Sequence, residues 1–316
     1  METNLNTIVD DKNEKEIDLN EIFNVLFNGK LIIAAIISAF SIIAIIYSLL
    51  LPNVYQSKAI LSPVGEANSS GISSVMKSVG GLASLAGVNA SQSSSGSNAI
   101  KALEKLNTLS FFEKNIMDNI FLPDLMAFDY WDASTKESIY DGNLFDQTTQ
   151  TWIRGFNYPQ TQIPSAQESY NIWLQHLRVS KDIETGFLTI TVKHQSPIVA
   201  QAWTELIVNQ LNYFFRSKAK REAEAATDYL NMQMAKANFT EIKLVTAQLL
   251  QQKLQQLTVV EASDFYVFDY IDPPAVMERK SEPVRSLICI IGAFLGAVFG
   301  CFIVLIRYYA FGKKLF

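Results

Sequence analysis

Residues 31–51 read LIIAAIISAFSIIAIIYSLLL, a run of 21 residues without a charged side chain. Thirteen of them are Leu, Ile or Phe, and together they favour transfer into a bilayer by about 4–8 kcal/mol. As an α-helix the run is about 31 Å long, which matches the hydrocarbon core. It is too long for a secretory signal peptide, and the sequence that follows, LPNV, offers no small-residue cleavage site. We therefore predict a retained membrane-spanning helix.

A second apolar run, LICIIGAFLGAVFGCFIVLI, occupies residues 287–306 between Arg285 and Arg307. A buried core helix of this length normally shows a polar stripe, and this run shows none. The composition therefore predicts a second span, with a central domain of residues 52–286 between the two.

Three glycines repeat at every fourth position of the second run. Gly292, Gly296 and Gly300 form a smooth face that lets another helix backbone approach closely. The alternative is that glycine is simply common in membrane helices. We expect a packing face, whose partner is the first span, where Ala35 and Ala39 offer small side chains, or another subunit.

Two spans place both tails, residues 1–30 and 307–316, on the same side of the membrane. The first tail is acidic and polar up to residues 17–23, where Asp18 and Glu21 form a capping box for a short amphipathic helix that leads into the span. Basic residues near the membrane usually set the orientation, but here four lie on each side, so charge leaves it open. They are Lys30, Arg307, Lys313 and Lys314 against Lys58, Arg279, Lys280 and Arg285.

The central domain mixes strand-like and helix-like patterns, which predicts an α+β fold. Short runs rich in Val, Ile and aromatic residues predict strands, and the Gly-containing turn at residues 182–186 predicts a hairpin. Apolar residues three or four apart predict helices. The expected strands are residues 54–61, 177–180, 187–194 and 265–271, and the expected helices are residues 98–120, 165–176, 197–236 and 241–257.

The helix expected at residues 197–236 is unusually long. Ser196 is a good N-cap and Pro197 suits the first helical position. Forty residues extend about 60 Å. The first half is apolar along Trp203 and Ile207, whereas the second half is charged and rich in alanine. Such a helix leaves the core, so it either extends into solvent or packs on neighbouring copies of the chain.

Three prolines lie between the last strand and the second span. Pro273 and Pro274 follow the strand, and Pro283 comes just before the membrane. Because proline removes a backbone donor and restricts the residue before it, this stretch is expected to be extended and stiff.

The segment of residues 123–165 is rich in aromatic residues among Asp, Thr and Gly. One interpretation is a surface on which sugars stack, and the other, which we favour, is aromatic packing under irregular loops. The Gly- and Ser-rich residues 65–98 predict a flexible loop, and residues 80–87 lack the Lys-Ser/Thr ending of a phosphate-binding loop.

The sequence shows no constellation typical of catalysis. His176 and His194 are isolated in sequence, and each is expected to be a surface or packing residue. The two cysteines, Cys289 and Cys301, both lie in the second span, so the central domain has no thiol. No spacing suggests a metal or cofactor site, and no basic patch suggests nucleic acid. We therefore expect no enzyme, cofactor or metal.

The order of these features resembles the Wzz-type chain-length determinants, also called polysaccharide co-polymerases. Each motif is weak alone, but their order and spacing are more specific. The resemblance rests on Ile17-Asp18-Leu19, Pro52-x-x-Tyr55, Thr185 through Ile190, Ser196-Pro197-x-x-Ala200, Trp203, Ile271-Asp272-Pro273-Pro274 and Glu282-Pro283. One further proline that family members often carry is absent near Met277.

The resemblance implies a bacterial inner-membrane protein with cytoplasmic tails and a periplasmic domain at residues 52–286. It implies an α/β base with a long projecting helix, a homo-oligomer, and a membrane polymerase as partner, with the growing glycan as a further contact. It also implies a regulator of surface polysaccharide length, such as lipopolysaccharide O-antigen, of the short class without a kinase domain. The alternative is a structural component of a capsule or exopolysaccharide export system that works with a separate kinase.

Overall fold

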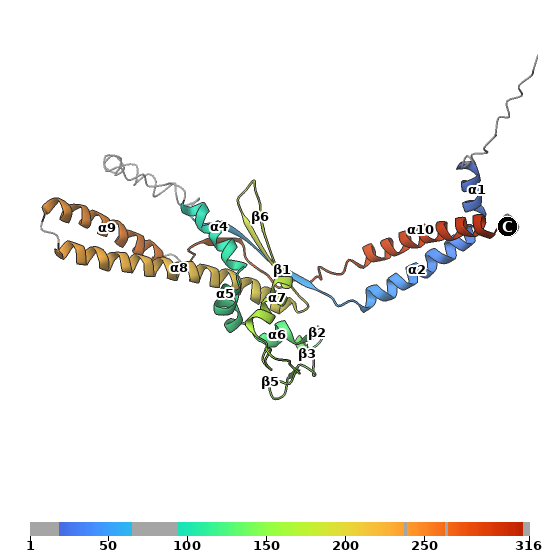
Figure 1. Ribbon diagram of the computed structural model, residues 1–316, viewed down its shortest axis with the longest axis horizontal. Coiled ribbons are helices and arrows are strands. Elements are labelled where there is room, and N and C mark those ends of the chain that lie inside the picture. The colour runs from blue at the N-terminus through green and yellow to red at the C-terminus, as the bar shows by residue number, and fades with distance from the viewer. Residues whose placement is uncertain (1–18, 65–93, 237–238, 263–264, 312–316) are drawn as a thin grey trace, which may run out of the picture. The chain divides into compact units, whose positions relative to one another are not determined.

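The computed structural model describes residues 19–64, 94–236, 239–262 and 265–311 (Figure 1). They fall into two compact units, which are described separately. One unit combines residues up to 52 with residues from 282 onwards, and the other holds residues 53–281. The expected cap at Asp18, most of the Gly- and Ser-rich loop and the end of the C-terminal tail lie outside the described residues.

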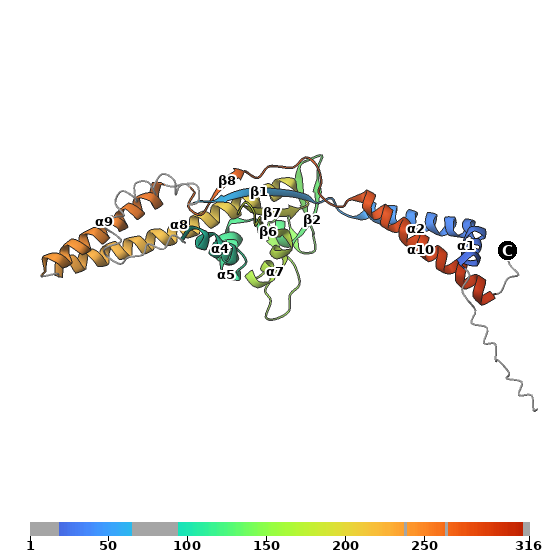
Figure 2. The ribbon, with the colours of Figure 1, turned by 90° about the horizontal axis from the view of Figure 1, so that it is seen from above.

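The first unit contains α1 (Leu19–Asn28), α2 (Lys30–Leu50) and α10 (Arg285–Phe311). Helices α2 and α10 run antiparallel and pack along their length (Figures 1 and 2). Within the described residues, two helices are long and apolar enough to cross a membrane, residues 30–50 and 285–310, with mean hydropathies of 2.6 and 2.8. The structure thus has the two candidate membrane helices that the sequence predicts.

The second unit is built on a four-stranded antiparallel sheet with the order β6-β7-β1-β8. Its strands are β1 (Tyr55–Pro63), β6 (Leu177–Lys181), β7 (Leu188–His194) and β8 (Phe268–Asp272). The predicted β6–β7 hairpin is confirmed, and Gly186 takes the positive φ of 72° that its turn requires. Alternate β7 residues are buried, so one face of the sheet forms part of the core.

Helix α8 (Pro197–Lys236) covers the buried face with its first half. Trp203, Ile207 and Leu211 lie in the same core as Leu188 and Ile190 of β7. Further core residues come from short helical segments between β1 and β6. These are α4 (Ser94–Leu106), α5 (Leu109–Phe111), the π-helical η1 (Phe112–Ile116), the 3-10 η2 (Met117–Asn119), α6 (Leu122–Met126) and α7 (Ala166–His176).

The prediction of a single helix at residues 98–120 is wrong, because the helix is interrupted at Asn107 and Thr108. Thr108 has extended backbone angles, and its hydroxyl donates to the carbonyl of Lys105 at 2.7 Å and accepts from the N–H of Phe111 at 3.3 Å. A threonine that caps a new helix competes with the continuing one. The break turns Phe111 and Phe112 into the core.

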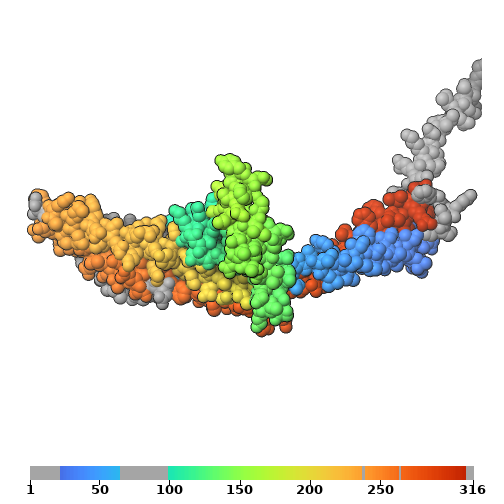
Figure 3. Space-filling model, turned by 90° about the horizontal axis from the view of Figure 1, so that it is seen from below, coloured from blue at the N-terminus to red at the C-terminus, as the bar shows by residue number. Residues whose placement is uncertain are grey.

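Helix α9 (Thr240–Ala262) returns along α8 and forms a long helical hairpin with it (Figure 3). Near the end of α9, Lys220 of α8 donates to Glu261 at 2.7 Å. The return helix is thus five residues longer at its end than the sequence pattern suggested. The mixed α+β fold with two candidate membrane helices and one long helix is confirmed.

Two small hairpins complete the second unit. They are formed by β2 (Phe128–Asp132) with β3 (Glu137–Tyr140), and by β4 (Phe145–Asp146) with β5 (Thr151–Trp152). Both belong to the aromatic-rich segment of residues 123–165.

Candidate functional site

The glycine face of α10 packs against α2 within the same chain. An added Cβ at Gly292 would clash with the Cβ of Ala44. At Gly296 it would lie 3.0 Å from the Cα of Ile37 and 2.9 Å from the Cβ of Phe40. Side chains at these positions therefore cannot be accommodated without separating the two helices.

At Gly300 an added Cβ would lie 3.2 Å from the Cα of Ile33, so close approach extends over two turns. Ala35 and Ala39, which the sequence suggested as the opposing residues, are instead exposed. The reason is helical geometry. Ile33 and Ile37 lie on the face toward α10, and a residue two positions further along points about 200° away.

The start of α8 is fixed by two consecutive residues. The Ser196 hydroxyl accepts from the N–H of Val199 at 3.4 Å, and Pro197 is the first residue of the helix. Ser196 is fully buried, and its own N–H donates to Nδ1 of His194 at 2.9 Å. Ser196 thus links the last residue of β7 to the first turn of the long helix.

Trp203, which the sequence singles out with Ser196 and Pro197 near the start of the long helix, is only 4% exposed. Its ring centroid lies 5.2 Å from that of Trp173 and 5.0 Å from that of His194. A side chain so enclosed cannot form part of a surface between subunits. With the apolar half of α8, Trp203 packs on the sheet of its own chain.

The two histidines that are isolated in sequence meet in the fold. The rings of His176 and His194 lie 5.6 Å apart, both beside Trp203. Because Nδ1 of His194 accepts from Ser196, its Nε2–H donates to the carbonyl of Asp124 at 3.0 Å. Burial lowers the pKa of His194 to about 4, and burial also lowers the pKa of His176. They are packing residues, as the sequence suggested.

Asn212 is a buried polar residue of α8 that sequence reasoning missed. Its Oδ1 accepts from the N–H groups of Tyr266, Val267 and Phe268 at 3.1, 2.8 and 3.1 Å. Its Nδ2 donates to the carbonyl of Phe268 at 3.0 Å. One side chain thus satisfies four backbone groups where the chain enters β8. The sequence feature that could have identified it is the presence of a polar residue beside Leu211 on the apolar half of the long helix.

The segment that carries Pro273, Pro274 and Pro283 has no helix and runs beside the start of β1. The Ser57 hydroxyl donates to the carbonyl of Ala275 at 3.0 Å. Further along, the N–H of Ser281 donates to the carbonyl of Val54 at 2.8 Å. Within the unit of residues 53–281, the residues that follow Pro273 and Pro274 therefore lie extended along the start of β1.

The aromatic-rich segment packs largely on itself. Phe121, Phe128, Tyr140, Phe145 and Trp152 make a chain of edge-to-face contacts. This supports packing for these rings. Three other aromatic side chains of the segment are exposed, and Tyr158 is 97% exposed. They are Tyr130, Phe156 and Tyr158.

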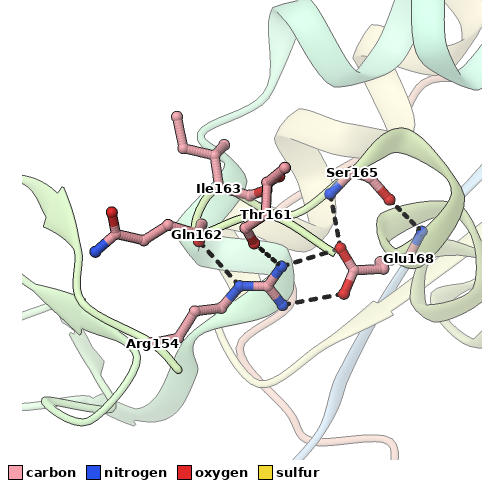
Figure 4. Close-up of polar contacts among 6 residues, drawn as sticks. All are labelled: Arg154, Thr161, Gln162, Ile163, Ser165 and Glu168. Atoms are coloured by element: carbon pink, nitrogen blue, oxygen red, sulfur yellow. Dashed lines mark hydrogen bonds and ion pairs between the residues drawn. The ribbon is translucent and has the colours of Figure 1, made fainter. Parts of the chain in front are cut away.

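The loop that carries Tyr158 is held by Arg154 (Figure 4). The Arg154 guanidinium donates to both carboxylate oxygens of Glu168 at 3.1 and 3.0 Å, and to the carbonyls of Gln162 and Thr161 at 2.9 and 2.7 Å. Glu168 also accepts from the N–H of Ser165, whose hydroxyl caps α7. These hydrogen bonds, chiefly from Arg154, lower the pKa of Glu168.

Replacing Arg154 with lysine is expected to reduce the free energy of unfolding by about 1–2 kcal/mol. A lysine keeps the charge but cannot reproduce the two-pronged contact with Glu168 together with two carbonyl contacts. Urea unfolding followed by tryptophan fluorescence measures the loss. The same exchange at the exposed Arg178 is expected to change stability by less than about 0.5 kcal/mol. Equal effects of the two exchanges contradict the prediction.

The outer part of the α8–α9 hairpin carries many exposed apolar side chains. Their exposed fractions range from 44% to 63%. They are Tyr229, Met232, Ile242, Leu244, Val245, Leu249 and Leu254. Isolated surface apolar residues are normal, but such a density along one hairpin is typical of a surface that packs on another chain.

Within the described ranges, no group of three or more His, Cys, Asp or Glu residues is arranged to hold a metal ion. Cys289 and Cys301 are both partly exposed on α10.

Residues 15–108 match the family model described as "Wzz: Chain length determinant protein". No curated protein gives a significant match. Among solved structures, a full-length bacterial polysaccharide co-polymerase is 12% identical, with a TM-score of 0.40 over 95% of this chain and 100% of that one. A fragment of WzzB, a polysaccharide co-polymerase from Salmonella Typhimurium, is 13% identical, with a TM-score of 0.32 over 73% and 100%.

Both TM-scores lie below 0.5, so the likeness to a family rests on the sequence match of residues 15–108. It covers the first candidate membrane helix, β1 and α4, and it includes Pro52 and Tyr55. Residues 15–108 of this chain are therefore similar in sequence to the Wzz chain length determinant family.

Proposed function

We propose that this protein regulates the chain length of a surface polysaccharide, such as lipopolysaccharide O-antigen or a related glycan. The match of residues 15–108 to the chain length determinant family is the observation that carries the proposal. The pair of candidate membrane helices and the long helical hairpin are consistent with it. In this proposal the protein is a scaffold for a membrane polymerase and performs no catalysis itself.

The proposed location is the bacterial inner membrane. Residues 31–51 and 287–306 cross it, residues 1–30 and 307–316 face the cytoplasm, and residues 52–286 face the periplasm. The absence of cysteine from residues 52–286 is compatible with an oxidising compartment.

Homo-oligomerisation is supported by the surface of the α8–α9 hairpin. Its exposed apolar residues gain burial if hairpins of neighbouring copies pack side by side. Trp203 cannot contribute, because it is already buried within one copy. The native mass of the full chain in detergent tests this part, and a monomer at all concentrations contradicts it.

Deletion of the gene distinguishes the proposal from its alternative. A regulator of length leaves surface glycan in place but with an altered or random length distribution. A component of an export system, working with a separate kinase, leaves no surface glycan at all. The glycan ladder on a gel gives either result directly.

Gly296→Leu is expected to disturb the glycan length distribution at an unchanged protein level. The added side chain meets the backbone of Ile37 and the ring of Phe40, so α10 and α2 must separate. Contacts of this helix pair with a polymerase then change as well. The glycan ladder, with the protein quantified by immunoblot, measures the effect.

Ala297→Leu is the matched control, since it adds similar bulk one residue further on. Ala297 lines a shallow apolar groove on α10 with Val298 and Cys301, where a larger side chain has room. We expect it to leave the glycan ladder unchanged. A normal ladder for Gly296→Leu at normal protein level contradicts the role of the glycine face.

A further inference from the structure

Only Gly29 separates helix α1 from α2, the first candidate membrane helix. The N–H of Gly29 donates to the carbonyl of Val25 at 3.0 Å, and the N–H of Ile33 donates to the carbonyl of Gly29 at 3.1 Å. Figure 1 shows α1 turned at a large angle to the direction of α2. If α2 crosses a bilayer, α1 therefore lies close to the plane of its surface.

Gly29 sets the position of α1 against α10. An added Cβ there would lie 2.6 Å from Cγ1 of Val304, so only glycine permits this approach. Val25, one turn earlier, is 5% exposed and lies on the same side of α1. The contact between α1 and α10 therefore uses the face that carries Val25 and Gly29.

A second apolar face of α1 stays largely exposed among the residues that the structure describes. Phe23 and Phe27 are 70% and 61% exposed, and they lie one turn apart on the same face. Asn24 and Asn28 are also exposed, and they lie on the next face around the helix. The exposed surface of α1 is therefore divided into an aromatic side and an amide side.

Neighbouring residues indicate that lipid covers the aromatic side. Leu31, at the start of α2, is 78% exposed and belongs to the surface that faces hydrocarbon if α2 spans a bilayer. The Lys30 ammonium lies 4.6 Å from the centroid of the exposed Phe27 ring, an arrangement that allows the cation to stay at the level of lipid headgroups while the ring enters the bilayer. At the same end of the helix pair, Tyr309 is exposed two residues after Arg307, a composition typical of a membrane–water interface.

We propose that α1 is an interfacial helix whose Phe23 and Phe27 side chains insert into the surface of the bilayer. Asn24 and Asn28 then face water. The continuity of this aromatic face with the lipid-facing surface of α2 favours lipid as its partner over a second copy of the chain. Such a helix fixes the rotation and depth of the α2–α10 pair from outside the hydrocarbon core.

Spin labels on the full chain test this proposal. Cys289→Ala and Cys301→Ala first remove the native thiols. Phe23→Cys, Asn24→Cys, Phe27→Cys and Asn28→Cys are then labelled one at a time in vesicles of phosphatidylethanolamine and phosphatidylglycerol. We expect labels at 23 and 27 to be more accessible to oxygen than to a water-soluble nickel chelate, and labels at 24 and 28 to show the reverse. The ratio of oxygen to nickel accessibility is expected to differ at least several-fold between the two pairs of positions.

A label introduced by Leu31→Cys gives the reference for lipid. Nickel accessibility at 23 and 27 equal to that at 24 and 28 overturns the proposal, because α1 then lies in water. Low access of both reagents at 23 and 27, together with dipolar broadening, also overturns it, because a second copy then covers the face. The measurement reads lipid exposure alone, so its outcome is separate from that of any glycan assay.

Phe23→Ser in the chain labelled at Phe27→Cys provides a second test. We expect the label at 27 to move toward higher nickel access, because the aromatic side chains that hold this face in the bilayer are then both gone. The control is Asn24→Ser in the same labelled chain, which keeps Phe23 and is expected to leave the accessibility at 27 unchanged. An unchanged accessibility after Phe23→Ser contradicts anchoring by the aromatic side chains.

Discussion

Asn212→Leu is expected to reduce the free energy of unfolding of the unit of residues 53–281 by at least about 3 kcal/mol. The substitution removes the partner of three N–H groups and one carbonyl at the start of β8. A buried backbone group without a partner costs about 1–3 kcal/mol, and water reaches this site poorly because Asn212 is 4% exposed. Leucine fills a similar volume, so the loss is one of hydrogen bonding.

Urea unfolding of the full chain in detergent measures the effect. All four tryptophans lie within residues 53–281, so their fluorescence reports on this unit. Asn209→Leu is the matched control, since Asn209 lies three residues earlier on α8 and is exposed. It is expected to change stability by less than about 0.5 kcal/mol. Similar midpoints for the two leucine variants would falsify the assigned role of Asn212.

Acidification is expected to remove about 3 kcal/mol of stability through His194 alone. Burial lowers the pKa of His194 to about 4 in the folded chain, below the ordinary value of 6.5. The neutral ring is favoured by folding, so its contribution is complete above pH 6.5 and is lost as the pH falls toward 4. Protonation also places a donor at Nδ1, where the N–H of Ser196 needs an acceptor.

Other groups near the His194 ring also change protonation in this pH range. The test therefore compares the pH dependence of stability between variants. His176 lies beside His194 with a lowered pKa, which gives pH dependence of the same sign. Burial raises the pKa of Asp124, which works in the opposite direction and increases stability as the pH falls. His194→Gln is expected to show a smaller loss of stability than the wild-type chain between pH 6.5 and 4. His176→Gln is the control, and it keeps most of the wild-type slope.

Some features were predictable because a short stretch of chain decides them. Hydropathy over about 20 residues marks the two candidate membrane helices, since transfer into lipid depends on composition within the segment. The β6–β7 hairpin follows from a Gly-containing turn between alternating runs. The start of α8 follows from Ser196 and Pro197, because capping involves only the first turn.

Other features depend on contacts between residues far apart in the chain. His194 lies on the same face of β7 as the buried Ile190 and Val192, a position that the alternation along the strand indicates. Its meeting with His176 depends on contacts between separate elements of the fold. Asn212 bonds to residues 54 to 56 positions later. The break at Thr108 arises where local capping and core packing together outweigh the helical pattern of residues 98–120.

The sequence by itself determined the two apolar spans, the glycine face of the second one and the length of the long helix, because each is a property of consecutive residues. Only the tertiary structure decided which residues those glycines meet. Helical rotation turns Ile33, Ile37 and Phe40 toward α10 and leaves Ala35 and Ala39 exposed, and no count of small residues along one helix can fix its rotation against another.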